Sequence, residues 1–167
     1  DAAIATLKTA DRAFPDTPEI KYELAMLNER QGHIKEVERL LRQVIALNPD
    51  SAQAYNALGY TLADHNKSLP EALDLITQAL NIAPNDPFIL DSMGWVRFRM
   101  GQLDRAAEYL RRAYAQRPEA DICAHYAEVL WKKGDHERAT ALLREGYKKD
   151  PKNPTVIDTL KRLGVKP

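Results

Sequence analysis

The sequence predicts an all-α fold in which helix pairs stack into a solenoid, and three observations support this prediction. Five prolines recur with spacings of 34, 35, 34 and 33 residues, at Pro15, Pro49, Pro84, Pro118 and Pro151. Three glycines each lie 17 residues before one of these prolines, at Gly32, Gly101 and Gly134. Apolar residues between these landmarks follow the period of a helix. A repeat of about 34 residues with such features is typical of a helical solenoid.

Residues 52–86 show how one repeat encodes two helices. The first helix presents four residues on one face, at i, i+3, i+4 and i+7, namely Tyr55, Leu58, Gly59 and Leu62. Pro70 suits the first turn of the second helix, where a missing N–H costs little. Pro84 closes the repeat, because the residue before a proline is disfavoured in helical geometry.

The same pattern divides the whole chain into segments. We expect helix pairs at residues 18–51, 52–86, 87–119 and 120–153, a lone second helix of a truncated repeat at 1–17, and a capping helix with its tail at 154–167. Such a cap is expected because a terminal pair cannot bury its apolar face alone. Small residues share one position in the first helices, at Ala25, Gly59, Gly94 and Ala127. They predict that the two helices of each pair approach closely.

Polar residues interrupt the apolar pattern in two first helices. Lys21 and Asn28 stand where large apolar residues are usual, so we expect the first helix of residues 18–51 to pack less tightly. Arg97 also occupies an apolar position, and we expect its stem to follow the edge of the core while its charge reaches water. One extra residue widens the turn at 65–70.

Composition narrows the class of protein. The 167 residues carry 24 Lys and Arg against 24 Asp and Glu, and this formal net charge of zero argues against binding duplex nucleic acid. The sequence contains no run of about 18 apolar residues, so it predicts no membrane-spanning segment. It also contains no basic segment followed by an apolar one, so it predicts no signal peptide. The single cysteine, Cys123, excludes an internal disulfide and a cysteine-rich metal site.

The neutral total conceals two halves of opposite charge. Residues 1–86 carry 8 Lys and Arg against 13 Asp and Glu, a formal charge of −5. Residues 87–167 carry 16 against 11, a formal charge of +5. A solenoid keeps such halves apart, so a partner would meet a graded surface. The alternative is a chance imbalance within a fragment of a longer array.

The repeat resembles that of the tetratricopeptide repeat (TPR) family. The matching pattern in residues 52–86 is Tyr55-x-x-Leu58-Gly59-x-x-Leu62, followed by Ala72, Leu75-Ile76, Ala79 and Pro84. Residues 87–119 repeat it, and the resemblance extends over residues 1–153. It implies a segment of a right-handed superhelix that acts as a non-catalytic scaffold or adaptor for a protein or peptide partner.

Three shorter stretches are similar to TPR lipoproteins of the Gram-negative outer membrane, at residues 58–64, 90–96 and 125–131. In those proteins the repeats form an adaptor that faces the periplasm, binds a carboxyl-terminal processing protease and presents cell-wall hydrolases to it. The resemblance therefore implies an adaptor at the periplasmic face of the outer membrane. The lipid-attachment cysteine and the signal sequence are absent from this sequence, and a cytoplasmic location is the alternative.

The first helices of successive repeats line the inner, concave surface of such a solenoid. Residues of these helices that point away from the pair interface form the predicted partner-binding groove: Tyr22, Asn56, Tyr60, Asp64, Asp91, Trp95, Phe98, Arg99, Glu128, Trp131 and Lys132. Aromatic side chains exposed together are frequent anchors of binding surfaces. We therefore expect a partner segment to stack on Trp95 and Trp131. The alternative for each ring is packing against the first helix of the next repeat.

Nothing in the sequence indicates catalysis, a metal or a cofactor. The four histidines form no His-x-x-x-His pair, and we interpret them as turn or helix-end residues: His33, His65, His125 and His136. Cys123 falls at a core position, where a buried and unreactive thiol is expected. The glycines form no phosphate-binding loop, and no two carboxylates share an apolar pocket.

Two other functional classes stay open. One is a structural or assembly module of a larger complex, and the other is the regulatory region of a multidomain enzyme. We also expect self-association or fraying at residues 1–17, because a missing first helix would leave Ile4 and Leu7 exposed. A natural short N-terminal helix is the alternative to a truncated repeat.

Overall fold

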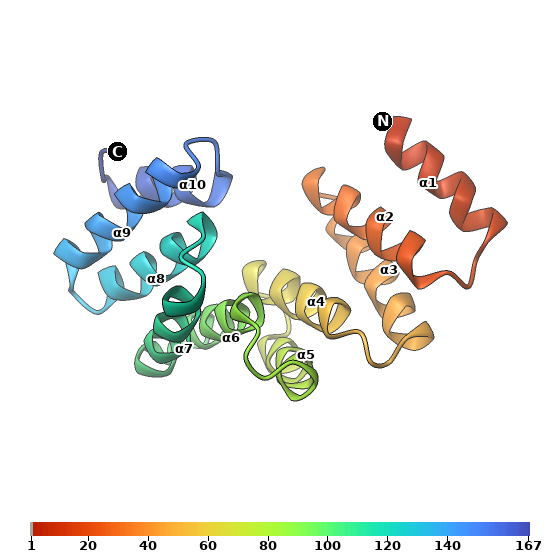
Figure 1. The fold of residues 1–167 in the computed structure, drawn as a ribbon, viewed down its shortest axis with the longest axis horizontal. Coiled ribbons are helices and arrows are strands. Elements are labelled where there is room, and N and C mark those ends of the chain that lie inside the picture. Colours follow the sequence, from red (N-terminus) through yellow and green to blue (C-terminus); the bar gives the residue numbers. More distant parts are fainter. Residues whose placement is uncertain (1) are drawn as a thin grey trace. The chain divides into compact units, whose positions relative to one another are not determined.

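The computed structural model describes residues 2–167 and, over that range, contains ten α-helices and no strands. In chain order they are α1 (Ala2–Ala13), α2 (Pro18–Arg30), α3 (Ile34–Leu47), α4 (Ala52–Asp64), α5 (Leu69–Ile82), α6 (Pro87–Arg99), α7 (Leu103–Gln116), α8 (Ala120–Lys132), α9 (His136–Lys149) and α10 (Pro154–Leu163) (Figure 1). The predicted all-α fold is confirmed. Within the described residues, no helix is long and apolar enough to cross a lipid bilayer.

Prolines and capping residues fix where the helices begin. Proline occupies one of the first two positions of α2, α5, α6 and α10. Four other side chains accept a hydrogen bond from a backbone N–H in the first turn of the following helix, those of Ser51, Asp86, Asp135 and Asn153. These caps satisfy donors that have no partner inside the helix, so α4, α6, α9 and α10 each start at a defined residue.

The turns within three helix pairs share one design. Gly32, Gly101 and Gly134 adopt φ values of 74°, 77° and 92°, the left-handed region that glycine enters without steric cost. The turn between α4 and α5 is one residue longer. There Asn66 and Ser68 take the left-handed conformation, with φ values of 52° and 42°. The extra residue noted in the sequence thus produces a wider turn without glycine.

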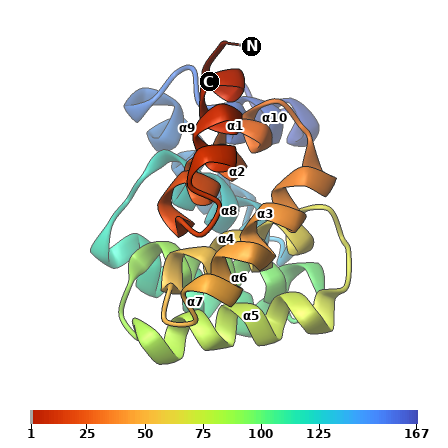
Figure 2. The same cartoon turned by 90° about the vertical axis from the view of Figure 1, so that its right-hand side faces the viewer.

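The chain forms two compact units, which we describe separately: unit 1 extends to Pro84 and unit 2 spans Asn85–Pro167. In unit 1, α2 pairs with α3 and α4 with α5, while α1 packs on α2 (Figures 1 and 2). In unit 2, α6 pairs with α7 and α8 with α9. Helix α8 also contacts α6 and the capping helix α10, and these three helices form one layer of unit 2. Helices α7 and α9 form the other.

The close approach of paired helices depends on small residues. A Cβ atom added at Gly59 would lie 2.6 Å from Cγ1 of Ile76, and one added at Gly94 would lie 2.5 Å from Cγ of Leu110. Carbon atoms do not approach so closely in a packed core, so a larger residue would push the helices apart. The predicted role of the small residues is therefore confirmed at these two positions.

Helix α10 covers the end of unit 2, as expected for a cap. It packs on α8 and α9, and it buries Val156 and Leu160 in a core that also contains Leu130 and Leu143. Gly164 ends the helix in the left-handed conformation, with φ of 68°. The last pair of helices therefore has its apolar face covered by α10.

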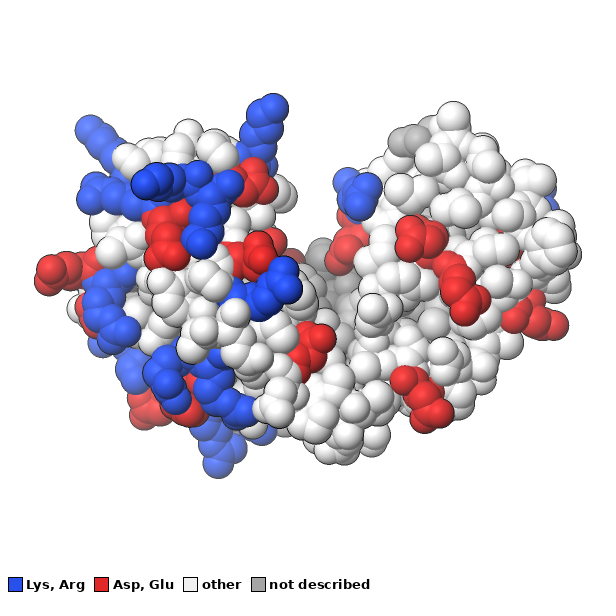
Figure 3. Space-filling model, in the orientation of Figure 1, with Lys and Arg blue, Asp and Glu red and all other residues white. Residues whose placement is uncertain are grey.

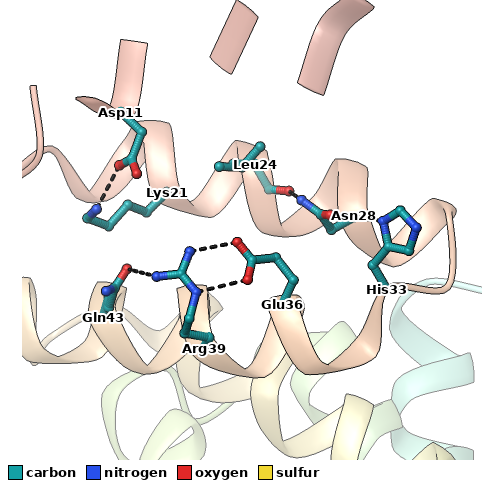
Figure 4. A network of polar contacts seen from close by, with 8 residues as sticks. All are labelled: Asp11, Lys21, Leu24, Asn28, His33, Glu36, Arg39 and Gln43. Atoms are coloured by element: carbon teal, nitrogen blue, oxygen red, sulfur yellow. Dashed lines mark hydrogen bonds and ion pairs between the residues drawn. The ribbon is translucent and has the colours of Figure 1, made fainter. Parts of the chain in front are cut away.

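Both polar residues of α2 that depart from the apolar pattern are buried and hydrogen-bonded (Figure 4). Lys21 is 6% exposed, and its Nζ atom lies 2.6 Å from Oδ1 of Asp11 on α1. Asn28 is 2% exposed and donates from Nδ2 to the carbonyl of Leu24 at 2.7 Å. Its Oδ1 lies 3.1 Å from Nδ1 of His33. Bonded polar groups are tolerated in a core, so both side chains are accommodated inside it, and the looser packing of α2 stays a prediction.

The prediction for Arg97, a stem at the edge of the core and a charge in water, is confirmed only in part. The residue is half-buried at the end of α6, as expected for a stem at the edge of the core. Its Nη1 donates to Oε1 of Gln102 at 2.8 Å, and its Nε is buried without a partner in the described chain. The guanidinium thus contacts the turn after α6 instead of lying fully in water.

Helix α1 is better covered than the sequence indicated. Ile4 is 8% exposed and Leu7 is half-buried, because α1 packs on α2. The expected exposure of this face is therefore wrong for Ile4 and only partly right for Leu7. The exposed large apolar side chain of this segment is Phe14, at 63%. Residue 1 of the segment lies outside the described residues. Self-association through residues 1–17 stays a prediction.

Candidate functional site

The predicted groove residues divide between the two units. Those of unit 1 lie on α2 and α4: Tyr22, Asn56, Tyr60 and Asp64. Those of unit 2 lie on α6 and α8: Asp91, Trp95, Phe98, Arg99, Glu128, Trp131 and Lys132. The structure brings the second set together, because α6 and α8 are in contact.

Trp95 lies at the centre of an aromatic stack between α6 and α8. Its ring centroid is 4.3 Å from that of His125 and 5.1 Å from that of Phe98, with interplanar angles of 25° and 27°. Trp95 is only 4% exposed. The expectation that it is an exposed anchor is therefore wrong, since the histidine of the next first helix covers its face. Packing against that helix, the alternative considered for each ring, applies to Trp95.

A buried Asp–His pair supports this stack. Nδ1 of His125 lies 2.9 Å from Oδ1 and 3.1 Å from Oδ2 of Asp91. A carboxylate can only accept, so the imidazole Nδ1–H donates. Asp91 is 7% exposed and His125 is 2% exposed, and a buried carboxylate needs such a partner. The interpretation of His125 as a turn or helix-end residue is wrong, because it lies inside α8 and joins α8 to α6.

Four residues at the C-terminal ends of α6 and α8 stay accessible, and we call them the aromatic–basic wall: Phe98, Arg99, Trp131 and Lys132. Phe98 and Trp131 are half-buried, and the Trp131 ring stacks on His136 with 4.2 Å between centroids. The Arg99 guanidinium lies 6.0 Å from the centroid of the Trp95 ring, within range of a cation–π contact. Lys132 is exposed at the end of α8. The wall therefore offers aromatic surface and positive charge.

An ion pair fixes the third helix of this layer. Arg162 of α10 donates from Nη1 and Nη2 to the two carboxylate oxygens of Glu128, at 2.7 and 2.8 Å. Its Nε donates to Asp158 at 2.6 Å. Hydrogen bonds to the two carboxylates raise the pKa of Arg162 above its usual value. Glu128, predicted as a groove residue, thus has its carboxylate engaged by a residue that sequence reasoning missed.

The equivalent surface of unit 1 is acidic. Burial raises the pKa of Glu29 on α2, and the nearby carboxylate of Asp64 on α4 raises it further. Burial and then the charges of Glu29 and Glu23 raise the pKa of Tyr22. Oδ1 of Asn56 is buried without a hydrogen-bond partner in the described chain. A positively charged group placed here would relieve the repulsion between the carboxylates.

Cys123 lies within α8 and is buried. It has no exposed surface, and burial, with a further contribution from Glu145, raises its thiol pKa to about 12. A thiol is an effective nucleophile only as the thiolate. The expected unreactive thiol is therefore consistent with both its burial and its pKa. Within residues 2–167, no three His, Cys, Asp or Glu side chains are placed to hold a metal ion together.

We expect Cys123 to react very slowly with a thiol reagent such as 5,5′-dithiobis(2-nitrobenzoic acid) in the folded protein at pH 8. Almost none of the thiol is ionised at that pH, and the sulfur has no exposed surface. The same protein in guanidinium chloride should react within seconds, because its pKa returns to the value of a free cysteine. Equal labelling rates for folded and unfolded protein would contradict the assigned burial.

Paired helices of nearly constant length, stacked at a constant repeat, define a helical repeat scaffold. One family model, described as tetratricopeptide repeat, matches residues 34–87 and 92–154, and a second model with the same description matches residues 1–60. The chain belongs to the tetratricopeptide repeat family. Proteins of this family generally mediate protein–protein interactions, and the scaffold is typically non-catalytic.

Two curated relatives show the extent of the similarity. The chain is 44% identical over 117 residues to the TPR repeat-containing protein PA4667 of Pseudomonas aeruginosa, which covers 70% of this chain and 20% of that protein. It is 24% identical over 166 residues to the TPR repeat-containing protein YpiA of Bacillus subtilis, which covers 98% of this chain and 38% of that protein. The chain thus spans well under half the length of either relative.

Solved structures support the fold. TTC0263, a thermophilic TPR protein of Thermus thermophilus, matches with a TM-score of 0.82 at 22% identity, over 99% of this chain and 91% of that one. PilW, a type IV pilus biogenesis factor, matches with a TM-score of 0.77 at 19% identity, over 98% and 78%. At these identities the likeness concerns the fold alone.

Proposed function

We propose that this chain is a non-catalytic scaffold that holds a protein partner against the aromatic–basic wall of unit 2. The observation that carries the proposal is that the accessible side chains of the wall lie on helices that are held together by buried or bidentate side-chain pairs. The Asp91–His125 pair joins α6 to α8, and the Glu128–Arg162 pair joins α8 to α10. A partner that binds the wall therefore meets rings and cations whose backbone is already ordered, which lowers the entropic cost of binding.

The chemistry of the wall selects the kind of segment that fits it. Phe98 and Trp131 offer ring faces and edges to apolar or aromatic side chains. Arg99 and Lys132 offer positive charge, and the carboxylates of Asp91 and Glu128 on the same two helices are already engaged by His125 and Arg162. A partner segment that combines aromatic or aliphatic residues with Asp or Glu complements this wall.

The more specific proposal concerns the cellular role. We infer an adaptor at the periplasmic face of the Gram-negative outer membrane, which binds a carboxyl-terminal processing protease and presents cell-wall hydrolases to it. Two points support it: the resemblance of three stretches to outer-membrane TPR lipoproteins, and the 44% identity to a protein of Pseudomonas aeruginosa, a Gram-negative bacterium.

A binding assay with a three-residue variant of the wall tests the proposal. Arg99→Glu, Trp131→Ala and Lys132→Glu together remove one ring and reverse two charges. We expect this variant to bind the purified protease of the native organism at least about 100-fold more weakly than wild type, measured by biolayer interferometry. Circular dichroism would verify that the helices are retained.

The matched control reverses two charges on second helices of two pairs, Lys35→Glu on α3 of unit 1 and Arg105→Glu on α7 of unit 2. Both side chains are exposed, so this control should bind the protease as wild type does. Failure of the wild type to bind the protease would refute the protease role. Equal binding by wild type and the wall variant would refute the wall as the binding surface.

A further inference from the structure

The positive charge of unit 2 is concentrated at its C-terminal end. Residues 85–143 carry 9 Lys and Arg against 9 Asp and Glu, so they are balanced. Residues 144–167 carry 7 against 3. Lys and Arg side chains lie over the end of unit 2 that contains α10, and others lie over its opposite end (Figure 3). The excess thus belongs to the end of α9, to α10 and to the tail that follows it.

The same region contains a hollow of about 390 Å³, which we call the α9–α10 hollow. It is lined by Tyr147, Pro151, Ile157, Leu160, Lys161, Val165 and Pro167. Its lining is mostly apolar, and Ile157 is 45% exposed. The tail is held in place to form one side, because the N–H of Val165 donates to the carbonyl of Leu160 at 2.9 Å and Nε of Arg144 donates to the carbonyl of Lys166 at 3.3 Å.

The carboxylates of this region are already engaged. Glu145 accepts from the hydroxyl of Tyr114 at 2.7 Å, and Asp158 accepts from Arg162 at 2.6 Å. Asp150 accepts from the backbone N–H of Lys152 at 3.0 Å. Lys161 lines the hollow, and three more lysines are adjacent in the chain to a lining residue: Lys148, Lys152 and Lys166. We call these four the rim lysines, and none of them has a carboxylate partner in the described chain. The hollow is therefore an apolar site in a segment with an excess of positive charge.

We propose that the α9–α10 hollow is a second docking surface, distinct from the aromatic–basic wall, and that it binds an acidic segment of a partner protein. A leucine or phenylalanine of that segment enters the hollow, and flanking Asp or Glu residues pair with the rim lysines. Charge complementarity selects this occupant. A membrane surface fits less well, because Ile157 is the single exposed large apolar side chain in residues 144–167, and one side chain offers little surface to insert into a lipid bilayer.

Fluorescence anisotropy with a synthetic peptide tests the proposal on the full chain. The probe is the labelled peptide Asp-Glu-Glu-Leu-Asp-Asp-Phe-Glu-Glu-Leu-Asp. One comparison peptide replaces every Asp and Glu with Asn and Gln, and the other replaces Leu and Phe with Ser. We expect the probe to bind at least about tenfold more tightly than either comparison peptide, and its affinity to fall as salt is raised.

Two variants of the chain locate the binding. Lys148→Glu with Lys161→Glu reverses the rim charge, and Ile157→Ser removes apolar surface from the hollow; all three side chains are exposed. Each variant should weaken probe binding about tenfold. The control Lys35→Glu with Arg105→Glu changes the net charge equally and should leave the affinity unchanged. The wall variant should also bind normally, which separates this proposal from the proposed function.

Several results would overturn the proposal. Probe binding that is equal in the hollow variants and the control would place the site elsewhere. Preferential binding to vesicles containing one third phosphatidylglycerol, lost in Lys148→Glu with Lys161→Glu, would identify a membrane surface instead. Concentration-dependent association in sedimentation velocity, abolished by Ile157→Ser, would show that a second copy of the chain occupies the hollow.

Discussion

Replacing Trp95 with alanine should destabilise the folded chain by about 3–5 kcal/mol, the range found when a buried aromatic residue is truncated in a core. The ring is 4% exposed and lies between Phe98 and His125, so its removal leaves a cavity between α6 and α8. It also removes the apolar cover of the Asp91–His125 pair. Urea denaturation followed by circular dichroism at 222 nm would measure the effect as a lower transition midpoint.

Trp131→Ala is the matched comparison. This ring is half-buried and stacks on His136 at the start of α9, so its loss should cost only about 1 kcal/mol. Similar losses for the two variants would contradict the different roles assigned to the two tryptophans. The larger expected cost of losing Trp95 also decides which residues the binding tests change. A double change of Trp95 and Trp131 would mix loss of fold with loss of binding, so the wall variant leaves Trp95 in place.

Replacing Gly94 with valine should destabilise the protein by about 3 kcal/mol, the upper end of the range usual for overpacking. Even the first added carbon would lie 2.5 Å from Cγ of Leu110 and 3.2 Å from the carbonyl oxygen of Ala106. The second contact is with backbone, which cannot move aside as a flexible side chain can. Helices α6 and α7 would therefore have to separate.

Ala141→Val on α9 is the control for this prediction. It also introduces valine into a helix, but its position is exposed, so its cost should be limited to about 0.5 kcal/mol of helix propensity. Urea denaturation curves of the two variants give the comparison. If Gly94→Val were no less stable than Ala141→Val, the close approach of α6 and α7 would be wrong.

The helices could be predicted from the sequence because local signals mark their ends. Pro70 does lie in the first turn of α5, and Gly32, Gly101 and Gly134 do occupy turns with positive φ. These signals act within a few residues of the chain, so they need no knowledge of tertiary contacts. The fold followed because the same signals recur at a constant spacing.

The exposure of the candidate site could not be predicted in the same way. Helical periodicity places Trp95 on the face of α6 away from α7, but it does not show what the next first helix places over that face. The covering residue is His125, whose partner Asp91 lies 34 residues earlier. Glu128 and Arg162 are also 34 residues apart. Complementary charged or polar residues separated by one repeat length are thus the signal that could have revealed both pairs.

Partner binding by the wall variant distinguishes the proposed binding surface from the rest of unit 2. In our proposal, unit 2 holds a protein through the accessible rings and cations of α6 and α8, and not through the opposite layer. We expect Arg99→Glu, Trp131→Ala and Lys132→Glu together to weaken binding of the processing protease at least about 100-fold, and Lys35→Glu with Arg105→Glu to leave it unchanged. Equal affinities for the two variants, with both folded by circular dichroism, would contradict it.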